Sequence, residues 1–99
     1  MIEIYKQTKN FPKEETFGVI SQLRRAAVSV ASNIVEGCGR QSKNELRHFC
    51  TIALGSLAET EYLLELCEKL SYLSKHDFQN AEAKRKEVGA LLWIFYKNI

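Results

Sequence analysis

Apolar residues recur every three or four positions along almost the whole of this chain, the spacing that places them on one face of an α-helix. No segment shows the sustained two-residue alternation of a strand, and the hairpin dipeptides Asn-Gly and Asp-Gly do not occur. With 99 residues and one proline, the chain has the length of one small domain. We therefore predict an all-α fold in a single domain that spans residues 1–99.

The helical pattern breaks at three places and so predicts four helices. Asn10-Phe11-Pro12 ends the first segment, because the residue before a proline avoids the α conformation. Gly37-Cys38-Gly39 ends the second, and Ser74 begins the fourth as an N-cap with Asp77 three residues later. The expected helices span about residues 2–9, 13–37, 43–71 and 74–99. Short connections make successive helices antiparallel, so we expect an up-down four-helix bundle with a short first helix.

The second expected helix has one clear apolar face. At about 100° per residue, a single side of the helix collects the apolar positions Ile20, Leu23, Ala27, Val30 and Ile34. Gln22, Arg25, Ser29, Ser32 and Glu36 lie opposite. This face is the expected contribution of the second helix to the core.

The third expected helix begins at a capping box, Ser42-x-x-Glu45, in which each side chain satisfies an unpaired backbone N–H group. Its core stripe consists of Leu46, Phe49, Ala53, Leu57, Thr60, Leu64, Cys67 and Ser71. A second uncharged stripe lies roughly opposite and consists of Thr51, Gly55, Ala58 and Tyr62. A glycine inside a helix costs about 1 kcal/mol relative to alanine, so Gly55 indicates a close helix crossing. Two uncharged sides exceed what one small bundle can cover, which predicts an oligomer interface on the second stripe.

The fourth expected helix carries apolar residues on several sides and is therefore expected to be broadly buried. Most of them share one side, while Trp93 and Tyr96 lie elsewhere. The basic run Lys84-Arg85-Lys86 interrupts the pattern, and we interpret it as a solvated face.

Charge is nearly balanced, since 14 Lys and Arg residues face 12 Asp and Glu residues. The excess of basic groups lies in the first half of the chain, where Arg40, Lys43 and Arg47 cluster around one expected turn. Such a cluster has two interpretations, a solvated surface or a patch that faces phosphate groups. A net charge of +2 is too small to decide between them.

Motifs for catalysis, metals and cofactors are weak. Glu45-x-x-His48 has the spacing of di-iron bundles, but such sites need a second Glu-x-x-His pair. The other histidine, His76, has Leu73 and not a glutamate three residues before it. Cys38, Cys50 and Cys67 lack CxxC spacing, and Cys50 and Cys67 lie near the apolar stripe. Gly37-x-Gly39 follows a helix, unlike a nucleotide-binding loop. We therefore expect no metal, no cofactor and no enzymatic activity.

Four blocks of sequence resemble a known family. They are Phe11-Pro12-Lys13-Glu14-Glu15, Gln22-x-Arg24-Arg25-Ala26-Ala27, Ser32-Asn33-Ile34-x-Glu36-Gly37 and Ala53-Leu54-Gly55-Ser56-Leu57-x-Glu59. The chain resembles the four-helix-bundle family encoded in intervening sequences of bacterial 23S rRNA genes. The resemblance implies an antiparallel bundle that assembles into a homopentamer. A related protein, the accessory variability determinant of diversity-generating retroelements, forms a basic pentameric barrel that binds nucleic acid and a reverse transcriptase.

This sequence departs from the family in its first helix, because family members usually carry a longer one with a tryptophan-containing segment ahead of Ile4-Tyr5. We expect either that the start is truncated or that the first helix is very short. In both cases the core of a single chain would need more burial by a partner. The family motif also includes a polar stripe on the second helix. The stripe is either a network that fixes helix register or subunit contact, or a partner-binding strip; it consists of Arg25, Ser29, Ser32, Asn33 and Glu36.

Together these observations predict a non-enzymatic, oligomeric accessory protein that binds RNA or DNA and that has a protein partner such as a reverse transcriptase. The residues expected to contact phosphates are Arg24, Arg25, Arg40, Lys43 and Arg47. The alternative is a purely structural or protein–protein interaction module. No run of 18 apolar residues occurs, and an odd number of cysteines without a signal peptide predicts reduced thiols in the cytoplasm.

Overall fold

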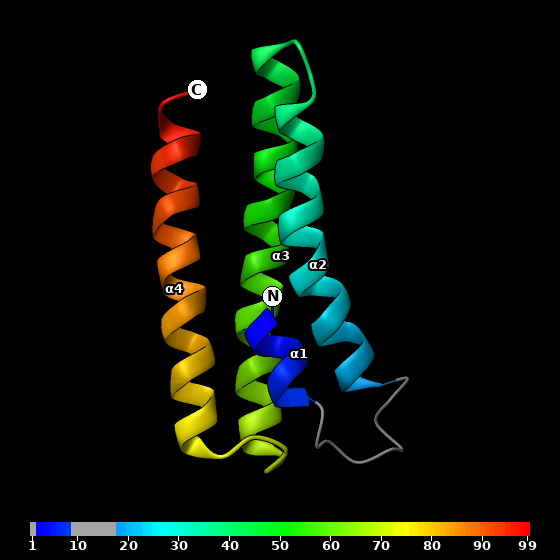
Figure 1. The fold of residues 1–99 in the computed structure, drawn as a ribbon, viewed down its shortest axis with the longest axis vertical. Coiled ribbons are helices and arrows are strands. Elements are labelled where there is room, and N and C mark those ends of the chain that lie inside the picture. Colours follow the sequence, from blue (N-terminus) through cyan, green and yellow to red (C-terminus); the bar gives the residue numbers. More distant parts are fainter. Residues whose placement is uncertain (1, 9–17) are drawn as a thin grey trace.

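The computed structural model describes residues 2–8 and 18–99 as four α-helices joined by short turns where the connections are described (Figure 1). Helix α1 spans Ile2–Thr8, α2 spans Val19–Cys38, α3 spans Lys43–Lys69 and α4 spans Lys75–Lys97. Neighbouring helices run antiparallel, and the molecule measures 43 × 24 × 17 Å. The prediction of an all-α, antiparallel arrangement of four helices with a short first helix is confirmed.

The helices pack in a ring in which α2 contacts α1 and α3, and α4 contacts α3 and α1. Because α1 is short, it lies beside only the N-terminal halves of α2 and α4 (Figure 1). The molecule therefore has one half with four helices and another half with three. Among the described residues, α1 does not extend past Ile2 along α2 and α4.

Helix α2 begins later than the sequence predicts. Gly18 has non-helical dihedral angles, φ −105° and ψ −119°, so α2 starts at Val19. The expected first turn at residues 13–17, with Pro12 before it, lies outside the described residues. At its other end α2 continues to Cys38, and Gly39 closes it as the C-cap.

The caps predicted for the two later helices are present. Ser42 Oγ accepts hydrogen bonds from the backbone N–H groups of Asn44 and Glu45 at 3.2 and 3.3 Å. Ser74 Oγ accepts one from the Asp77 N–H group at 3.0 Å. Helix α3 ends at Lys69, and Ser71 then takes a left-handed conformation with φ 63°. That conformation lets the Tyr72 N–H group bond back to the Cys67 carbonyl at 2.9 Å.

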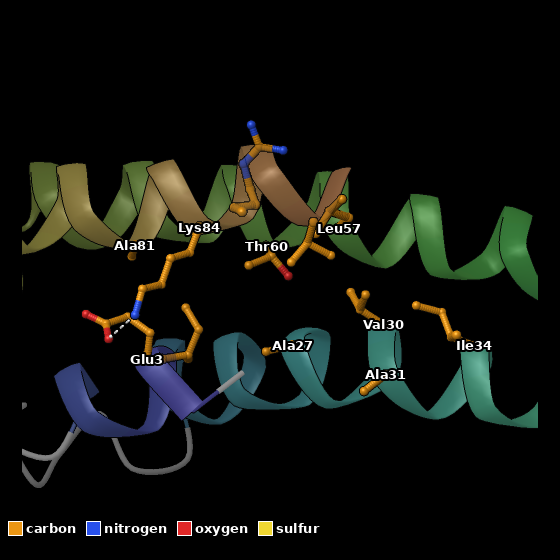
Figure 2. Close-up of a pocket in the computed structure, with 12 residues that line it drawn as sticks. Glu3, Ala27, Val30, Ala31, Ile34, Leu57, Thr60, Ala81 and Lys84 are labelled. Atoms are coloured by element: carbon orange, nitrogen blue, oxygen red, sulfur yellow. Dashed lines mark hydrogen bonds and ion pairs between the residues drawn. The ribbon is translucent and has the colours of Figure 1, made fainter. Parts of the chain in front are cut away.

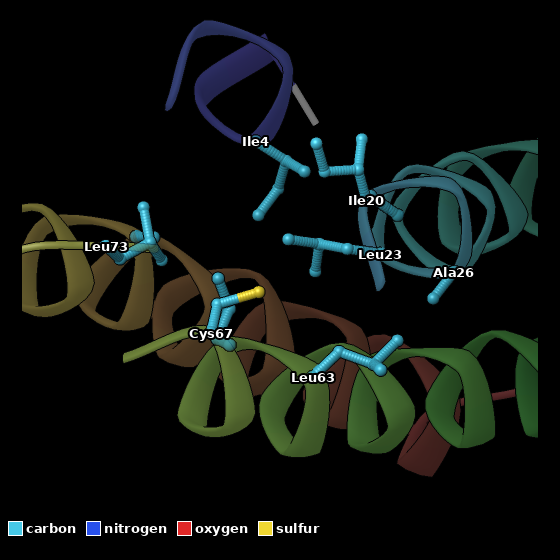
Figure 3. Packing of buried hydrophobic residues seen from close by; sticks show 10 residues of the cluster. Ile4, Ile20, Leu23, Ala26, Leu63, Cys67 and Leu73 are labelled. Carbon is cyan, nitrogen blue, oxygen red and sulfur yellow. The ribbon is translucent and has the colours of Figure 1, made fainter. Parts of the chain in front are cut away.

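The hydrophobic core divides into two clusters along the long axis. The larger cluster lies where α1 is present and brings all four helices together, with Leu23, Leu64 and Cys67 almost fully buried (Figure 3). The smaller cluster lies in the three-helix half and has Cys50, Ala53 and Leu92 as its buried members. The predicted core stripe of α3 is buried from Ala53 to Cys67, whereas Leu46 and Phe49 are half-buried and Ser71 is exposed.

Candidate functional site

The basic cluster lies at the turn between α2 and α3, at one end of the long axis (Figure 1). Arg40, Lys43 and Arg47 are all exposed there. The Arg40 guanidinium is already engaged, because it lies 2.6 Å from the Glu36 carboxylate and 3.8 Å from that of Glu45. The Arg40 guanidinium carbon also lies over the Phe49 ring, 5.2 Å from its centroid. In the described part of the chain, no carboxylate lies in salt-bridge contact with Lys43 or Arg47, so these two side chains supply the available positive charge.

Arg24 and Arg25 do not join this cluster. They lie near the opposite end of α2, and the 15 residues from Arg25 to Arg40 correspond to about 22 Å of helix. Arg24 donates a hydrogen bond from Nε to Thr8 Oγ1 at 2.8 Å, and its guanidinium lies 4.7 Å from the centre of the Tyr5 ring. Arg24 therefore fastens α1 to α2, while Arg25 is exposed. The five predicted phosphate contacts form two separate groups and not one patch.

The outer stripe of α3 lies on the surface of the single chain. Thr51, Gly55, Ala58 and Tyr62 are all exposed, and the Tyr62 side chain is 63% accessible. A Cβ atom added to Gly55 would meet nothing within 4 Å. No other described helix of this chain therefore crosses close to Gly55, and the space above it is open to another molecule.

The polar stripe of α2 includes a contact that fixes helix register. Ser29 Oγ and Ser56 Oγ lie 2.8 Å apart and join α2 to α3. Asn33 Nδ2 donates to the Ser29 carbonyl at 2.8 Å and to Ser29 Oγ at 3.0 Å. Because these half-buried polar groups satisfy one another, this part of the stripe has a structural role. Ser32 and Glu36 remain exposed on the same helix.

An apolar cavity of about 200 Å³ opens between the helices next to the N-terminal end of α1 (Figure 2). Its walls come from all four helices, and Figure 2 shows Val30 and Ile34 of α2 opposite Leu57 and Thr60 of α3. At one end Lys84 Nζ lies 3.1 Å from the Glu3 carboxylate. Sequence reasoning did not identify this cavity, because it exists only where α1 stops short of its neighbours.

One exposed basic run was predicted on α4, and this interpretation is wrong for Arg85. The Arg85 side chain is only 14% accessible and bonds the carboxylates of Glu82 on α4 and Glu61 on α3, the latter at 2.8 Å. The pKa of Arg85 is raised, first by its hydrogen bond with Glu82 and also by the nearby charges, against the opposing effect of burial. Lys84 and Lys86 are exposed, as expected of a solvated face, and Lys84 also pairs with Glu3 of α1.

The cysteines lie where the sequence placed them, with Cys38 exposed and Cys50 and Cys67 buried. Burial raises the pKa of the Cys50 thiol, and the neighbouring Cys38 adds to the effect. His48 is exposed at the edge of the Phe49 ring, as its predicted direction away from the core requires. Within residues 2–8 and 18–99, no three metal-binding side chains gather in one place.

Comparison with known proteins gives a family and a similar solved structure. The profile of the 23S rRNA-intervening sequence proteins matches residues 1–93. A crystal structure of a protein of unknown function from the S23 ribosomal protein family of Bacteroides thetaiotaomicron matches with a TM-score of 0.84 at 28% identity. That match covers 97% of this chain and 87% of the other. No curated protein matches the chain. Among the described helices, none combines the length and the apolar character needed to cross a membrane.

Proposed function

Because the chain belongs to the 23S rRNA-intervening sequence protein family, we propose that it is a non-enzymatic, oligomeric protein that binds RNA or DNA. The proposed contact is the α2–α3 end, where Arg40, Lys43 and Arg47 face solvent. Lys43 and Arg47 carry the proposal, since they are exposed cations one helical turn apart without a carboxylate partner among the described residues. Because the site has so few cationic groups, we expect them to contact the phosphate backbone and not to read the base sequence.

A single copy provides little attraction at this site. Glu36 and Glu45 offset two of the three cations, which leaves a local net charge of +1. Five copies at +2 each carry about +10, so a ring would present several weak sites to one polyanion at once. We propose that this ring is a homopentamer whose subunits meet on the α3 stripe of Thr51, Gly55, Ala58 and Tyr62. The exposure of these residues and the open space at Gly55 support that placement.

The test is binding of a labelled single-stranded RNA and of a DNA duplex as a function of salt concentration. Lys43→Ala/Arg47→Ala should weaken binding and lower the slope of log K against log salt by about 1 for each lost phosphate contact. Lys69→Ala/Lys75→Ala is the matched control, because it removes the same charge from exposed residues at the other end of the molecule. No binding at low ionic strength, or equal loss in both variants, would contradict the proposed site.

A second candidate is a protein-interaction module that binds no nucleic acid. The cavity beside α1 favours it, because most of its lining residues are small or branched apolar residues, which suit an apolar side chain of a partner. The two candidates differ in the salt experiment. A protein-interaction module shows no salt-dependent binding to either probe, and the Lys43/Arg47 variant then behaves as the unsubstituted chain does.

A further inference from the structure

The outward face of α4 carries a seam of exposed residues at alternating spacings of four and three. The seam consists of Ala83, Glu87, Ala90, Ile94 and Lys97, and all five side chains are exposed. The Ile94 side chain is 57% accessible, and Leu91 beside the seam is 63% accessible. This spacing aligns residues along one side of a helix and is the pattern that pairs two helices.

The fold itself does not use this seam. Ala81 and Leu92 are the buried residues of α4, and they identify the side of the helix that packs against the rest of the bundle. Ile94 follows Leu92 by two residues, about 200° around the helix, and so points away from that side. A large apolar side chain with this exposure, on the outward face of the last turns of α4, is a surface that another molecule can cover.

The seam is complementary in charge and volume to the same seam of a second copy that runs in the opposite direction. Rotation about a twofold axis beside residue 92 places Glu87 opposite Lys97 of a second copy, and Lys97 opposite the second copy's Glu87. The same rotation places Ala90 opposite Ile94, so that a small side chain faces a large one in each of the two middle layers. Charge and volume therefore match in all four layers of an antiparallel pair, and both copies offer the same surface, as a twofold contact requires.

The two charged residues cannot satisfy each other within one chain. They are ten residues apart, which corresponds to about 15 Å along the helix. Within the described part of the chain, neither Glu87 nor Lys97 takes part in an ion pair. A second copy is the occupant that supplies a positive group at one end of Ile94 and a negative group at the other, whereas a uniformly charged surface would be repelled by one of them.

We propose that α4 pairs antiparallel with α4 of a second copy over residues 87–97. The contact extends over about three helical turns, so its area is small beside the roughly 1,200–2,000 Å² of a stable interface. The pair therefore forms reversibly and depends on protein concentration. This contact is separate from the α3 stripe proposed above and does not require that stripe to be an interface.

Charge reversal tests the pairing by sedimentation equilibrium, in a Tyr62→Glu background that disables the α3 stripe. Glu87→Lys and Lys97→Glu each place like charges together at both ends of the pair, and each should raise the dissociation constant several-fold. The double variant restores both ion pairs in reverse and should return the dissociation constant to its starting value. Ile94→Glu should raise it at least tenfold. Equal association by all four variants, or two singles whose effects simply add in the double variant, would overturn the proposal.

Disulfide capture fixes the direction of the pair without depending on its affinity. In a Cys38→Ser background, a mixture of Glu87→Cys and Lys97→Cys chains should form a cross-linked dimer under mild oxidation, far more than either variant alone. Cross-linking of each variant with itself would indicate a parallel pair and would overturn the proposal. Absence of cross-linking in the mixture would do the same. Circular dichroism of each variant checks that the helices are retained, which is expected because every substituted position is exposed.

Discussion

At the scale of single residues, Ser71 holds a conformation that its side chain disfavours. Its φ of 63° lies in the left-handed region, which costs a residue with a Cβ atom about 1 kcal/mol and costs glycine little. We expect Ser71→Gly to raise the free energy of unfolding by about 0.5–1 kcal/mol, measured by urea denaturation. Ser71→Ala keeps the Cβ atom and should change stability little, so an equal gain in both variants would contradict this explanation.

The buried thiol of Cys50 makes stability fall at alkaline pH. Burial raises its pKa above the ordinary value of 9.0, so the unfolded chain ionises this thiol at a lower pH than the folded chain does. The stabilisation is complete below the unfolded pKa and is lost as pH rises through the folded pKa. We expect the free energy of unfolding to decline above about pH 9.

Two cysteine variants isolate this effect from other groups that ionise in the same range. Cys50→Ala should flatten the decline above pH 9, whereas Cys38→Ala removes only the smaller contribution of Cys38 to the raised pKa of Cys50 and should reduce the decline only slightly. Ellman's reagent provides a second measurement, since Cys38 should react in the folded protein and Cys50 only after unfolding. An identical pH slope in all three proteins would show that Cys50 does not contribute.

At the scale of helices, Arg85 joins α4 to α3 through its ion pairs with Glu82 and Glu61. Without it, the half-buried Glu82 carboxylate would lose its cation, and its buried Oε2 atom already has no hydrogen-bond partner among the described residues. We expect Arg85→Met to lower the free energy of unfolding by about 2 kcal/mol. Lys84→Met removes a neighbouring ion pair whose lysine is 63% accessible, and it should cost less than about 1 kcal/mol. Equal losses would mean that burial of the ion pair is irrelevant.

Two glycines separate packing within a chain from packing between chains. A Cβ atom at Gly37 would lie 3.0 Å from the Phe49 Cβ atom, so Gly37→Ala should destabilise the protein by about 1–3 kcal/mol. Gly55 has open space, and Gly55→Ala should stabilise a lone chain by up to about 1 kcal/mol through helix propensity. If the α3 stripe is an interface, Gly55→Ala also weakens assembly, which light scattering measures. A stabilised chain with unchanged mass would place the interface elsewhere.

The sequence allowed the helices and caps to be predicted because these depend on residues close together in the chain. Ser42 and Ser74 each act on N–H groups two or three residues away, and the core face of α2 follows from its periodicity. The bonds of Arg85 to Glu61 and of Arg24 to Thr8 could not be predicted, since their partners lie 24 and 16 residues away on other helices. The separation of the basic residues into two groups is different, because it follows from the length of α2 and could have been predicted from the sequence.

At the scale of the whole molecule, the two halves of the bundle should differ in stability. Where α1 is present, the buried cluster draws on all four helices, whereas the cluster in the other half has three buried members among the described residues. Fewer buried contacts favour local opening. Hydrogen exchange at low protein concentration should therefore be faster in residues 90–97 of α4 than in residues 78–85 of the same helix.

Raising the protein concentration distinguishes a frayed helix end from an uncovered interface. If α4 pairs with a second copy, exchange in residues 90–97 slows as the concentration rises, because association stabilises the half that a single chain leaves thinly packed. Ile94→Glu removes this dependence and leaves residues 78–85 unaffected. If exchange in residues 90–97 stays fast at every concentration, then the exposed Leu91 and Ile94 do not mark a contact between copies.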